Sequence, residues 1–380
     1  MDISNYRKYF PITENYTYLD NSGVAPVSTK VRDRVDGFLD EAMNSGVFAY
    51  DGWMEQVEDT RKLCSELVGC SPGEIAFVRS TSHGVSLVAS GYSWKKGDNV
   101  VIYEKEFPSN VYPWLGLVSK GVEVKRVKPG RNGFLDINDI KNTADPNTMV
   151  ISVSSVQFTN GYRIDLNELG RFCSENGILL FVDGIQSMGV VPMDVKRDNI
   201  DFLAADGHKW LLSPEGTGFF YCRKDLVESI NPPLLGWKSV VNDSSYEQID
   251  FTLKKTADRF EEGSFSVMGI LALGASIRML LDIGIENINK RVYSLGDLVI
   301  ENCDKRGFEV TSPRENEQRG GVVCFRFDHD LVKLREELIE KGIMVNFRGG
   351  AIRVSPHFYN NEQDIEHLFT TIDKLLEKRD

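Results

Sequence analysis

Short runs of apolar residues alternate with longer stretches of mixed polarity between about residues 74 and 221. The runs are rich in valine, isoleucine and phenylalanine, which is typical of buried strands, and the stretches between them have the spacing of amphipathic helices. This alternation predicts an α/β fold in which helical crossovers join the strands of a mainly parallel sheet. Seven strands are expected, at Glu74–Val78, Asn99–Tyr103, Glu123–Val127, Thr148–Ser152, Leu179–Val182, Phe202–Ala205 and Gly218–Tyr221. Two crossover helices are expected at residues 136–144 and 165–176, and Gly177 fits the stop of the second helix.

The pattern changes after about Leu281, where short apolar runs and helical stretches follow one another without the earlier regularity. Strands are expected at Phe308–Thr311, Gly321–Phe327, Met344–Phe347 and Ile352–Val354, and helices at Leu331–Lys341 and Glu362–Glu377. This mixture predicts a smaller α+β unit that packs against the first one. We therefore predict a large domain of residues 15–282 and a small domain made of residues 1–14 and 283–380.

Composition and charge narrow the possible functions. The chain has 380 residues, of which 41% are hydrophobic and 26% charged, as in ordinary globular proteins. Its net charge of −12 disfavours nucleic acid and anionic membranes as partners and favours a small-molecule substrate. No apolar run approaches the roughly 20 residues of a membrane span, and the first residues lack a signal-peptide pattern, so a cytoplasmic location is expected. The six cysteines form no CxxC pair, and neither a disulfide framework nor a metal site is indicated.

Polar residues with useful chemistry follow several of the expected strands. Ser82, Phe107, Asp183 and Lys209 each come just after one, and ligands of open α/β sheets bind beyond the carboxyl ends of the strands. A lysine amine can condense with an aldehyde cofactor, and a carboxylate from the neighbouring strand can keep the ring nitrogen of that cofactor protonated. The pattern therefore predicts a pyridoxal phosphate site with Lys209 and Asp183 at its centre.

These motifs resemble a known family. Residues 181–187 (Phe-Val-Asp-Gly-Ile-Gln-Ser) followed by Gly207-His208-Lys209 resemble the signature of class V aminotransferases and cysteine desulfurases, which are pyridoxal phosphate-dependent transferases and lyases of fold-type I. The resemblance continues in residues 18–21, 77–84, 106–110, 259–264 and 353–355, in one order along nearly the whole chain. It implies the fold, the cofactor pyridoxal 5'-phosphate, and a homodimer with shared active sites.

The resemblance also implies roles for residues around the cofactor. Lys209 would form the Schiff base and move the Cα proton of the substrate, while Asp183 would pair with the ring nitrogen and Gln186 would donate to the phenolic oxygen. Without the resemblance, a lysine after a strand is usually a solvated surface group, and an aspartate there is often a helix N-cap. The expected phosphate ligands are Thr81, Ser82, the backbone of His83, His208 and, from the neighbouring subunit, Ser264. Caps of a helix are the simpler interpretation of Thr81 and Ser82.

Three further residues are expected to contact the ring or the substrate. Phe107 takes the position where cysteine desulfurases carry a histidine stacked on the ring, although a core phenylalanine is the simpler interpretation. Arg353 matches the arginine that grips the substrate carboxylate, and Arg348 is a second candidate for that task. Either arginine is also a plausible surface ion-pair partner. Residues 21–23, Trp114 and residues 235–237 are candidates for contact with the substrate side chain.

Some positions depart from the cysteine desulfurase pattern. Residues 346–353 carry no cysteine, so persulfide formation on a loop before Arg353 is not expected. Asp206 stands where those enzymes place a hydroxyl residue, and an acid there would repel a phosphate unless it points away or is neutralised. Ser155 replaces an asparagine near the substrate carboxylate, a change for which nearby Gln157 offers compensation. Substrate recognition is therefore expected to differ from that of the desulfurases.

The leading hypothesis is a pyridoxal phosphate enzyme that acts at Cα of a small amino acid by aminotransferase-type chemistry, with a keto acid as acceptor. The same carbanion also permits C–S or other β-elimination, as in a lyase, and epimerisation, because pocket geometry alone decides its fate. A remote alternative is a protein that binds the cofactor without catalysis.

Overall fold

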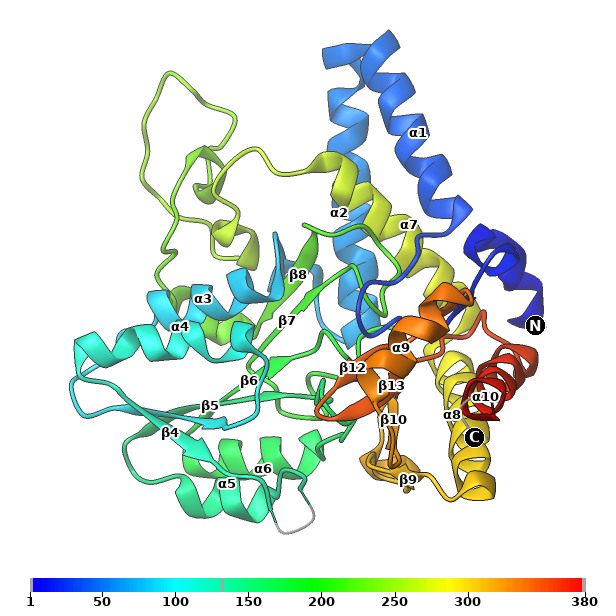
Figure 1. Cartoon of the computed structure of the whole chain (residues 1–380). Coiled ribbons are helices and arrows are strands. Elements are labelled where there is room, and N and C mark those ends of the chain that lie inside the picture. Colours follow the sequence, from blue (N-terminus) through cyan, green and yellow to red (C-terminus); the bar gives the residue numbers. More distant parts are fainter. Residues whose placement is uncertain (1–2, 131–132, 378–380) are drawn as a thin grey trace.

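The computed structural model describes residues 3–130 and 133–377 (Figure 1). Its centre is a seven-stranded sheet in the order β2-β8-β7-β6-β5-β3-β4. Neighbouring strands from β4 to β7 run parallel, and β8 runs antiparallel to both β7 and β2. The strands are β2 (Ile75–Val78), β3 (Asn99–Tyr103), β4 (Glu123–Val127), β5 (Thr148–Ser154), β6 (Leu179–Asp183), β7 (Phe202–Asp206) and β8 (Gly218–Cys222). The expected mainly parallel sheet of an α/β fold is confirmed.

Helices cover both faces of this sheet because side chains along each strand alternate between the faces. In β3, Val100 and Ile102 belong to the core cluster that also holds Val85 of α3 (Thr81–Gly91). Val101, in contrast, belongs to the cluster on the other face. That second cluster includes residues of α5 (Ile137–Thr143), α6 (Leu166–Asn176) and α7 (Val267–Ile283). Figure 1 shows α3 and the short α4 (Tyr112–Leu115) on one side of the sheet and α5 and α6 on the other.

The C-terminal part of the chain forms a second, antiparallel sheet in the order β12-β13-β10-β9. Its strands are β9 (Glu309–Val310), β10 (Val323–Arg326), β12 (Asn346–Arg348) and β13 (Ala351–Val354). The helices α8 (Ile285–Arg306), α9 (Leu331–Glu340) and α10 (Glu362–Glu377) share its core cluster. The strand expected at Met344–Phe347 is divided, because β11 (Ile343–Met344) pairs with β1 (Thr17–Tyr18) instead of entering the sheet with β12.

The N-terminal segment joins both parts of the molecule. After β1 the chain makes a bridge from Asp20 to Ser355, and Arg7 in the 3-10 helix η1 (Ile3–Tyr9) pairs with Asp364 of α10 at 2.7 Å. Residues 17–20 therefore attach to the C-terminal part of the chain, while α1 (Thr29–Asn44) and α2 (Tyr50–Val68) return to pack on α7. The division into domains at residues 14–15 and 282–283 stays a prediction.

Within residues 3–130 and 133–377, no single helix is both long enough and apolar enough to cross a membrane. The pair α7 and α8 meets that test together, with a bend of 81° between the two helices.

Candidate active site

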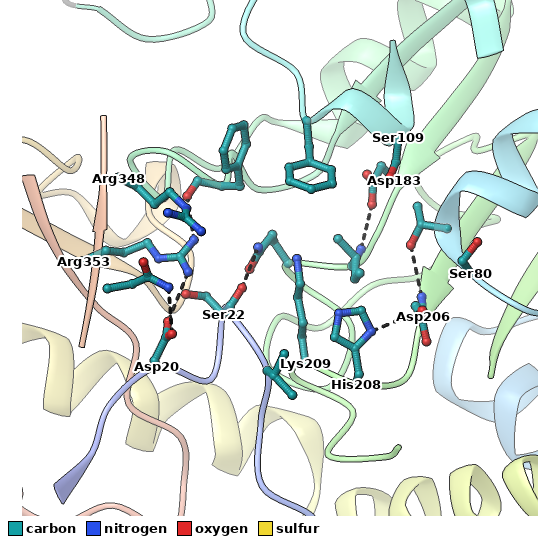
Figure 2. Close-up of a pocket in the computed structure, with 18 of the residues that line it drawn as sticks. Asp20, Ser22, Ser80, Ser109, Asp183, Asp206, His208, Lys209, Arg348 and Arg353 are labelled. Atoms are coloured by element: carbon teal, nitrogen blue, oxygen red, sulfur yellow. Dashed lines mark hydrogen bonds and ion pairs between the residues drawn. The ribbon is translucent and has the colours of Figure 1, made fainter. Parts of the chain in front are cut away.

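A cavity of about 440 Å³ opens where the carboxyl ends of β6 and β7, the start of α3 and the strands β12 and β13 meet (Figure 2). This position follows from the fold, because the carboxyl ends of parallel strands lie at one edge of the sheet. Nine residues expected from the sequence line this cavity: Thr81, Ser82, Phe107, Asp183, Gln186, His208, Lys209, Arg348 and Arg353. His83 and Ser264, which were also expected at the site, line a separate cavity of about 310 Å³.

Lys209 lies in the turn that follows β7 and reaches into the cavity. Burial lowers the pKa of its amine to about 8, although the negative charge of Asp183 opposes this shift. The Nζ atom lies 5.4 Å from the centre of the Phe107 ring. About a tenth of this amine is therefore uncharged at pH 7, and the neutral form is the one that can act as a nucleophile or a base.

Asp183 ends β6 and is 1% exposed. Burial raises the pKa of its carboxyl to about 7, with a further increase from the charge of Glu106. The backbone N–H of Ile185 donates to Oδ1 at 3.0 Å and opposes the increase. In the described part of the chain no ion pair forms to this carboxyl, so it can receive a cationic group that enters the cavity.

Gln186 is held in one orientation by its neighbours. The indole Nε1 of Trp210 donates to Oε1 of Gln186 at 2.9 Å, and an indole nitrogen can only donate. The amide nitrogen therefore faces the other way, where it donates to the carbonyl of Ser22 at 3.1 Å. Gln186 lines the cavity, and its expected donor role stays a prediction.

The start of α3 forms a polar corner of the cavity. Ser80 is the N-cap, and its Oγ accepts the backbone N–H of His83 at 3.2 Å. The expected His83 donor is thus engaged by the cap, whereas the hydroxyl of Ser82 donates to Ser109 Oγ at 2.7 Å. Free N–H groups and the dipole of a helix start favour an anion, so the corner suits a phosphate. Ser80 and Ser109 also line the cavity and were not expected from the sequence.

Asp206 lines the same corner, and its carboxylate has partners within the chain. Its carboxylate accepts the backbone N–H of Gly207 at 2.7 Å and lies 3.2 Å from Nδ1 of His208 (Figure 2). The backbone N–H of Asp206 in turn donates to Thr81 Oγ1 at 3.2 Å. The departure from a hydroxyl residue is therefore accommodated by local partners of the acid.

Arg353 on β13 is 2% exposed and holds a neighbouring acid. Its Nη2 donates to Asp20 at 3.1 Å, and its Nη1 donates to the carbonyl of Phe158 at 3.1 Å. Asn346 donates to the other oxygen of Asp20 at 2.8 Å. Arg348 is exposed on β12, and the hydrogen bond of its guanidinium goes to the carbonyl of Phe347 at 3.0 Å. The cavity thus contains two guanidinium groups: that of Arg353 is paired with Asp20, and that of Arg348 is exposed.

Phe107 is 41% exposed and is therefore not a core residue. Its ring meets the ring of Phe158 edge to face at a centroid distance of 5.2 Å, and both rings line the cavity. Trp114, in contrast, is fully buried against Phe181 and takes no part in the cavity. Of residues 21–23, Ser22 and Gly23 line the cavity, whereas residues 235–237 do not.

Ser155 and Gln157 do not line this cavity, and Ser155 lines a separate one. Ser155 Oγ donates to the carbonyl of Asp183 at 3.1 Å. The amide of Gln157 donates to Glu106 at 2.9 Å, so it is committed to a buried acid. Gln157 was expected to compensate for Ser155 at the substrate carboxylate, but its amide instead binds Glu106. Asp20, which holds Arg353, and Glu106, which approaches Asp183, were missed by the sequence reasoning.

The donor set of the cavity fits pyridoxal phosphate. A partly neutral amine, a buried carboxyl without an ion-pair partner and the start of a helix lie around one space. These features match an aldehyde, a ring nitrogen and a phosphate respectively. The volume of about 440 Å³ is within the range of small-molecule sites.

Comparisons with known proteins agree with this assignment. A family profile described as Aminotransferase class-V matches residues 17–368. A probable cysteine desulfurase of Methanothermobacter thermautotrophicus is 30% identical, over 99% of this chain and 98% of that protein. An uncharacterised aminotransferase, YcbU of Bacillus subtilis, is 29% identical, over 97% of this chain and 96% of that protein. The apo structure of a cysteine desulfurase from Thermococcus onnurineus superposes with a TM-score of 0.90 at 25% identity and covers 98% of both chains.

The fold and the site together define a pyridoxal phosphate enzyme of fold-type I. The chain belongs to the class-V aminotransferase family, because the family profile covers residues 17–368. Both statements confirm the resemblance found in the sequence. The roles of single residues at the site stay predictions.

Proposed function

We propose that this protein acts at Cα of a small amino acid, with Lys209 as the group that moves the α-proton. The observation that carries the proposal is one cavity that joins the amine of Lys209, the carboxyl of Asp183 and the guanidinium of Arg353. A base, an acid that can face a ring nitrogen and a carboxylate receptor are the parts that such chemistry requires.

The residues of the cavity have different roles, which follow from their surroundings. When bound, pyridoxal phosphate supplies an electron-accepting ring that stabilises negative charge on the substrate carbon. Asp183 holds the proton at the ring nitrogen, and Gln186 donates to the phenolic oxygen. Arg353 and Arg348 orient the substrate through its carboxylate. Lys209 would take the proton from Cα of the substrate.

Aminotransferase-type turnover is the leading form of this proposal. It needs one base that returns the proton to a neighbouring carbon and a keto acid that receives the amino group. The amine of Lys209, with its pKa near 8, can take up and release a proton close to neutral pH. One relative is itself described as an uncharacterised aminotransferase.

A lyase is the second candidate, favoured by the relative described as a probable cysteine desulfurase. In this reaction the α-proton leaves to Lys209 and a β-substituent departs from the substrate. The proposal assigns no role to a protein thiol. Cys324, the strand partner of Arg353, is buried, and burial raises the pKa of its thiol to about 11.

We further propose a homodimer in which Ser264 serves the site of the neighbouring subunit. Ser264 lies in a separate cavity, so within one chain it does not meet Lys209. Large apolar side chains are also exposed to solvent: Phe48 is 93% exposed and Ile249 is 92% exposed. Exposed apolar groups of this size are typical of surfaces that another protein covers.

The proposal is tested by adding single amino acids to cofactor-loaded protein and following the absorption spectrum, with product analysis for each responder. Transamination consumes a keto acid in proportion to turnover, whereas a lyase releases its fragment without one. Lys209→Ala is expected to lower turnover at least about 1,000-fold, because it removes the acid–base group. Turnover of this variant at the wild-type rate would contradict the proposal. Lys105→Ala, a change at an exposed lysine outside the cavity, is the matched control.

A further inference from the structure

Glu106 is a buried acid that none of the roles above uses. It lies three residues beyond the end of β3, is 6% exposed, and does not line the cavity. A carboxylate is costly to bury unless it is hydrogen-bonded, so its partners indicate what holds it there.

Three donors converge on this carboxyl. Oε1 accepts the backbone N–H of Ser154 at 2.9 Å and the amide of Gln157 at 2.9 Å. The hydroxyl of Ser154 donates to Oε2. Burial raises the pKa of Glu106, and these donors counteract that increase. Two of the three are nitrogen donors that cannot accept, so the surroundings of Oε1 favour the ionised form.

The position of Glu106 relative to the sheet brings this charge close to the cavity. Ser154, which binds Glu106 through both its backbone and its hydroxyl, is the direct register partner of Asp183 across β5 and β6. Glu106 therefore reaches over the end of β5 toward the strand that carries Asp183. Two charged groups act on Asp183: Glu106 raises its pKa, and Lys209 from the turn after β7 lowers it.

We propose that Glu106 is a positioning residue of the cofactor site. It places a second negative charge behind Asp183, and this charge keeps the proton between Asp183 and the cofactor's ring nitrogen at neutral pH. The inference rests on the proposed function and names a residue to which that function assigned no role. Its three hydrogen bonds fix where the charge lies. Because Phe107 is the next residue, the same bonds also set the start of the loop that carries the aromatic wall of the cavity.

The test measures Asp183 directly in cofactor-free protein, by the ¹³C chemical shift of its carboxyl as a function of pH. Glu106→Gln is expected to lower the pKa of Asp183 by about one unit, because it removes a nearby like charge. Ser154→Ala keeps the carboxyl of Glu106 and removes one of its hydrogen-bond donors. We therefore expect it to shift the pKa of Asp183 by less than about a third of the shift in Glu106→Gln. Glu106→Leu is a second neutral variant in case the glutamine variant does not fold.

A second measurement uses cofactor binding followed by absorption. Glu106→Gln should weaken binding about tenfold at pH 8, the equivalent of about one pKa unit, with a smaller loss at pH 6. An unchanged pKa of Asp183 in both neutral variants would overturn the inference. Equal pKa shifts in Glu106→Gln and Ser154→Ala would also overturn it, because they would indicate a purely structural role for Glu106. Failure of the wild-type protein to bind pyridoxal phosphate would contradict the proposed function instead, and the titration of Asp183 would still decide the role of Glu106.

Discussion

The amine of Lys209 is partly buried in the folded protein and hydrated in the unfolded chain, so it links stability to pH. Its folded-state pKa of about 8 lies below the ordinary value of 10.5, which means that folding disfavours the charged form. The resulting destabilisation is fully present below pH 8 and disappears as the pH rises toward 10.5. Lys209→Met should therefore stabilise the cofactor-free protein at pH 7 by up to about 3 kcal/mol.

Urea unfolding at pH 7 and at pH 10 checks this expectation. The gain of Lys209→Met should shrink at the higher pH, where the folded-state amine is uncharged and the unfolded-state amine, with its pKa of 10.5, has begun to lose its proton. Lys105→Met, at an exposed position, should change stability by less than about 0.5 kcal/mol at either pH. An equal gain at both pH values would show that packing, and not the buried charge, is responsible.

Asp20 competes with any carboxylate for Arg353. Its two oxygens are held by Arg353 at 3.1 Å and by Asn346 at 2.8 Å, and Asp20 itself lines the cavity. Asp20→Asn removes the compensating charge, so a small carboxylate such as acetate should bind to the cofactor-free protein about tenfold more tightly, a change of ~1.4 kcal/mol. Isothermal titration measures the affinity.

The matched control is Asn346→Ala, which removes the other partner of Asp20 and leaves its charge. It should alter acetate affinity less than about twofold. If both variants bind acetate as the wild type does, Asp20 does not limit the access of carboxylates to Arg353, and the exposed Arg348 becomes the better candidate for the receptor.

Some site residues are predictable from their own chemistry and their position after a strand, and others are not. Lys209 and Asp183 were found because each lies where an apolar run ends. Asp20 and Glu106 were missed because their significance depends on partners far away in the chain. Asp20 meets Arg353 across 333 positions and Glu106 meets Ser154 across 48, and nothing in the local pattern of either acid encodes these contacts.

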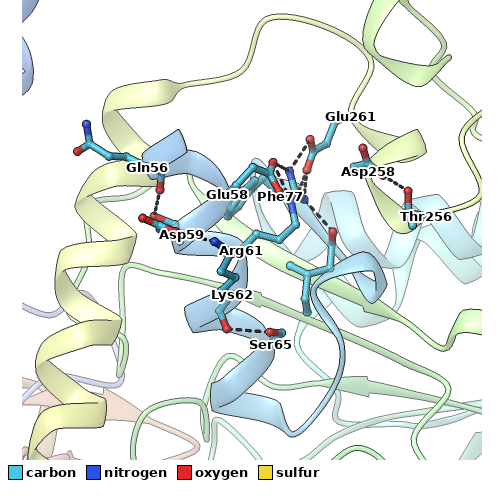
Figure 3. A network of polar contacts seen from close by, with 12 residues as sticks. Gln56, Glu58, Asp59, Arg61, Lys62, Ser65, Phe77, Thr256, Asp258 and Glu261 are labelled. Carbon is cyan, nitrogen blue, oxygen red and sulfur yellow. Dashed lines mark hydrogen bonds and ion pairs between the residues drawn. The ribbon is translucent and has the colours of Figure 1, made fainter. Parts of the chain in front are cut away.

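At the scale of elements, one buried ion pair joins α2 to the loop that carries Ser264 (Figure 3). Arg61 of α2 donates to both oxygens of Glu261, at 2.7 and 3.1 Å, and also to the carbonyl of Ile75. Glu261 in turn accepts the backbone N–H of Phe77 in β2 at 2.8 Å. Because Glu261→Gln leaves the buried Arg61 with only the exposed Glu58 as an ionic partner, it should cost about 3 kcal/mol of stability.

Glu58 provides a matched control, since it also contacts Arg61 at 3.0 Å but its side chain is 56% exposed. Glu58→Gln should cost less than about 1 kcal/mol. The midpoint of guanidinium unfolding, compared among the two variants and the wild type, measures both effects. Similar midpoints for the two variants would contradict the idea that burial makes the Arg61–Glu261 pair important.

The strand ends show where local patterns stop being informative. The expected strands β5, β6 and β7 were placed correctly, yet each extends beyond its last apolar residue, to Ser154, Asp183 and Asp206. Apolar periodicity marks burial of apolar side chains, whereas these polar residues are buried together with hydrogen-bond partners such as Glu106, Ile185 and Gly207. Strand extension at the site therefore depends on tertiary contacts that a local pattern does not contain.

At the scale of the whole molecule, the described surface carries two apolar projections. One is the apex between α1 and α2, with Met43, Val47 and Phe48 between 78% and 93% exposed. The other is the segment with Tyr246, Ile249 and Phe251, which are between 70% and 92% exposed. Both project at the top of Figure 1, the second as the yellow-green loop. Their exposure supports the proposed homodimer, and sedimentation should give twice the mass of 42.9 kDa.

Mixed dimers decide whether Ser264 acts across subunits. Ser264→Glu places a negative charge where a phosphate is expected and should lower turnover about 100-fold or more, while Lys209→Ala abolishes it. If the sites are shared, a dimer of one Lys209→Ala chain and one Ser264→Glu chain has one site with both defects and one site with none. Unfolding and refolding the two variants together should then recover about a quarter of wild-type activity, because half of the dimers are mixed and each has one intact site.

If Ser264 instead serves its own chain, every chain in the mixture carries a defective site, and activity after refolding equals the average of the two variants alone. Wild-type protein taken through the same treatment sets the reference for recovery. The outcome distinguishes two arrangements of the dimer. The contacts within each subunit are the same in both arrangements. Only the assembly as a whole differs between them, which is why neither the sequence pattern nor a single folded chain contains the answer.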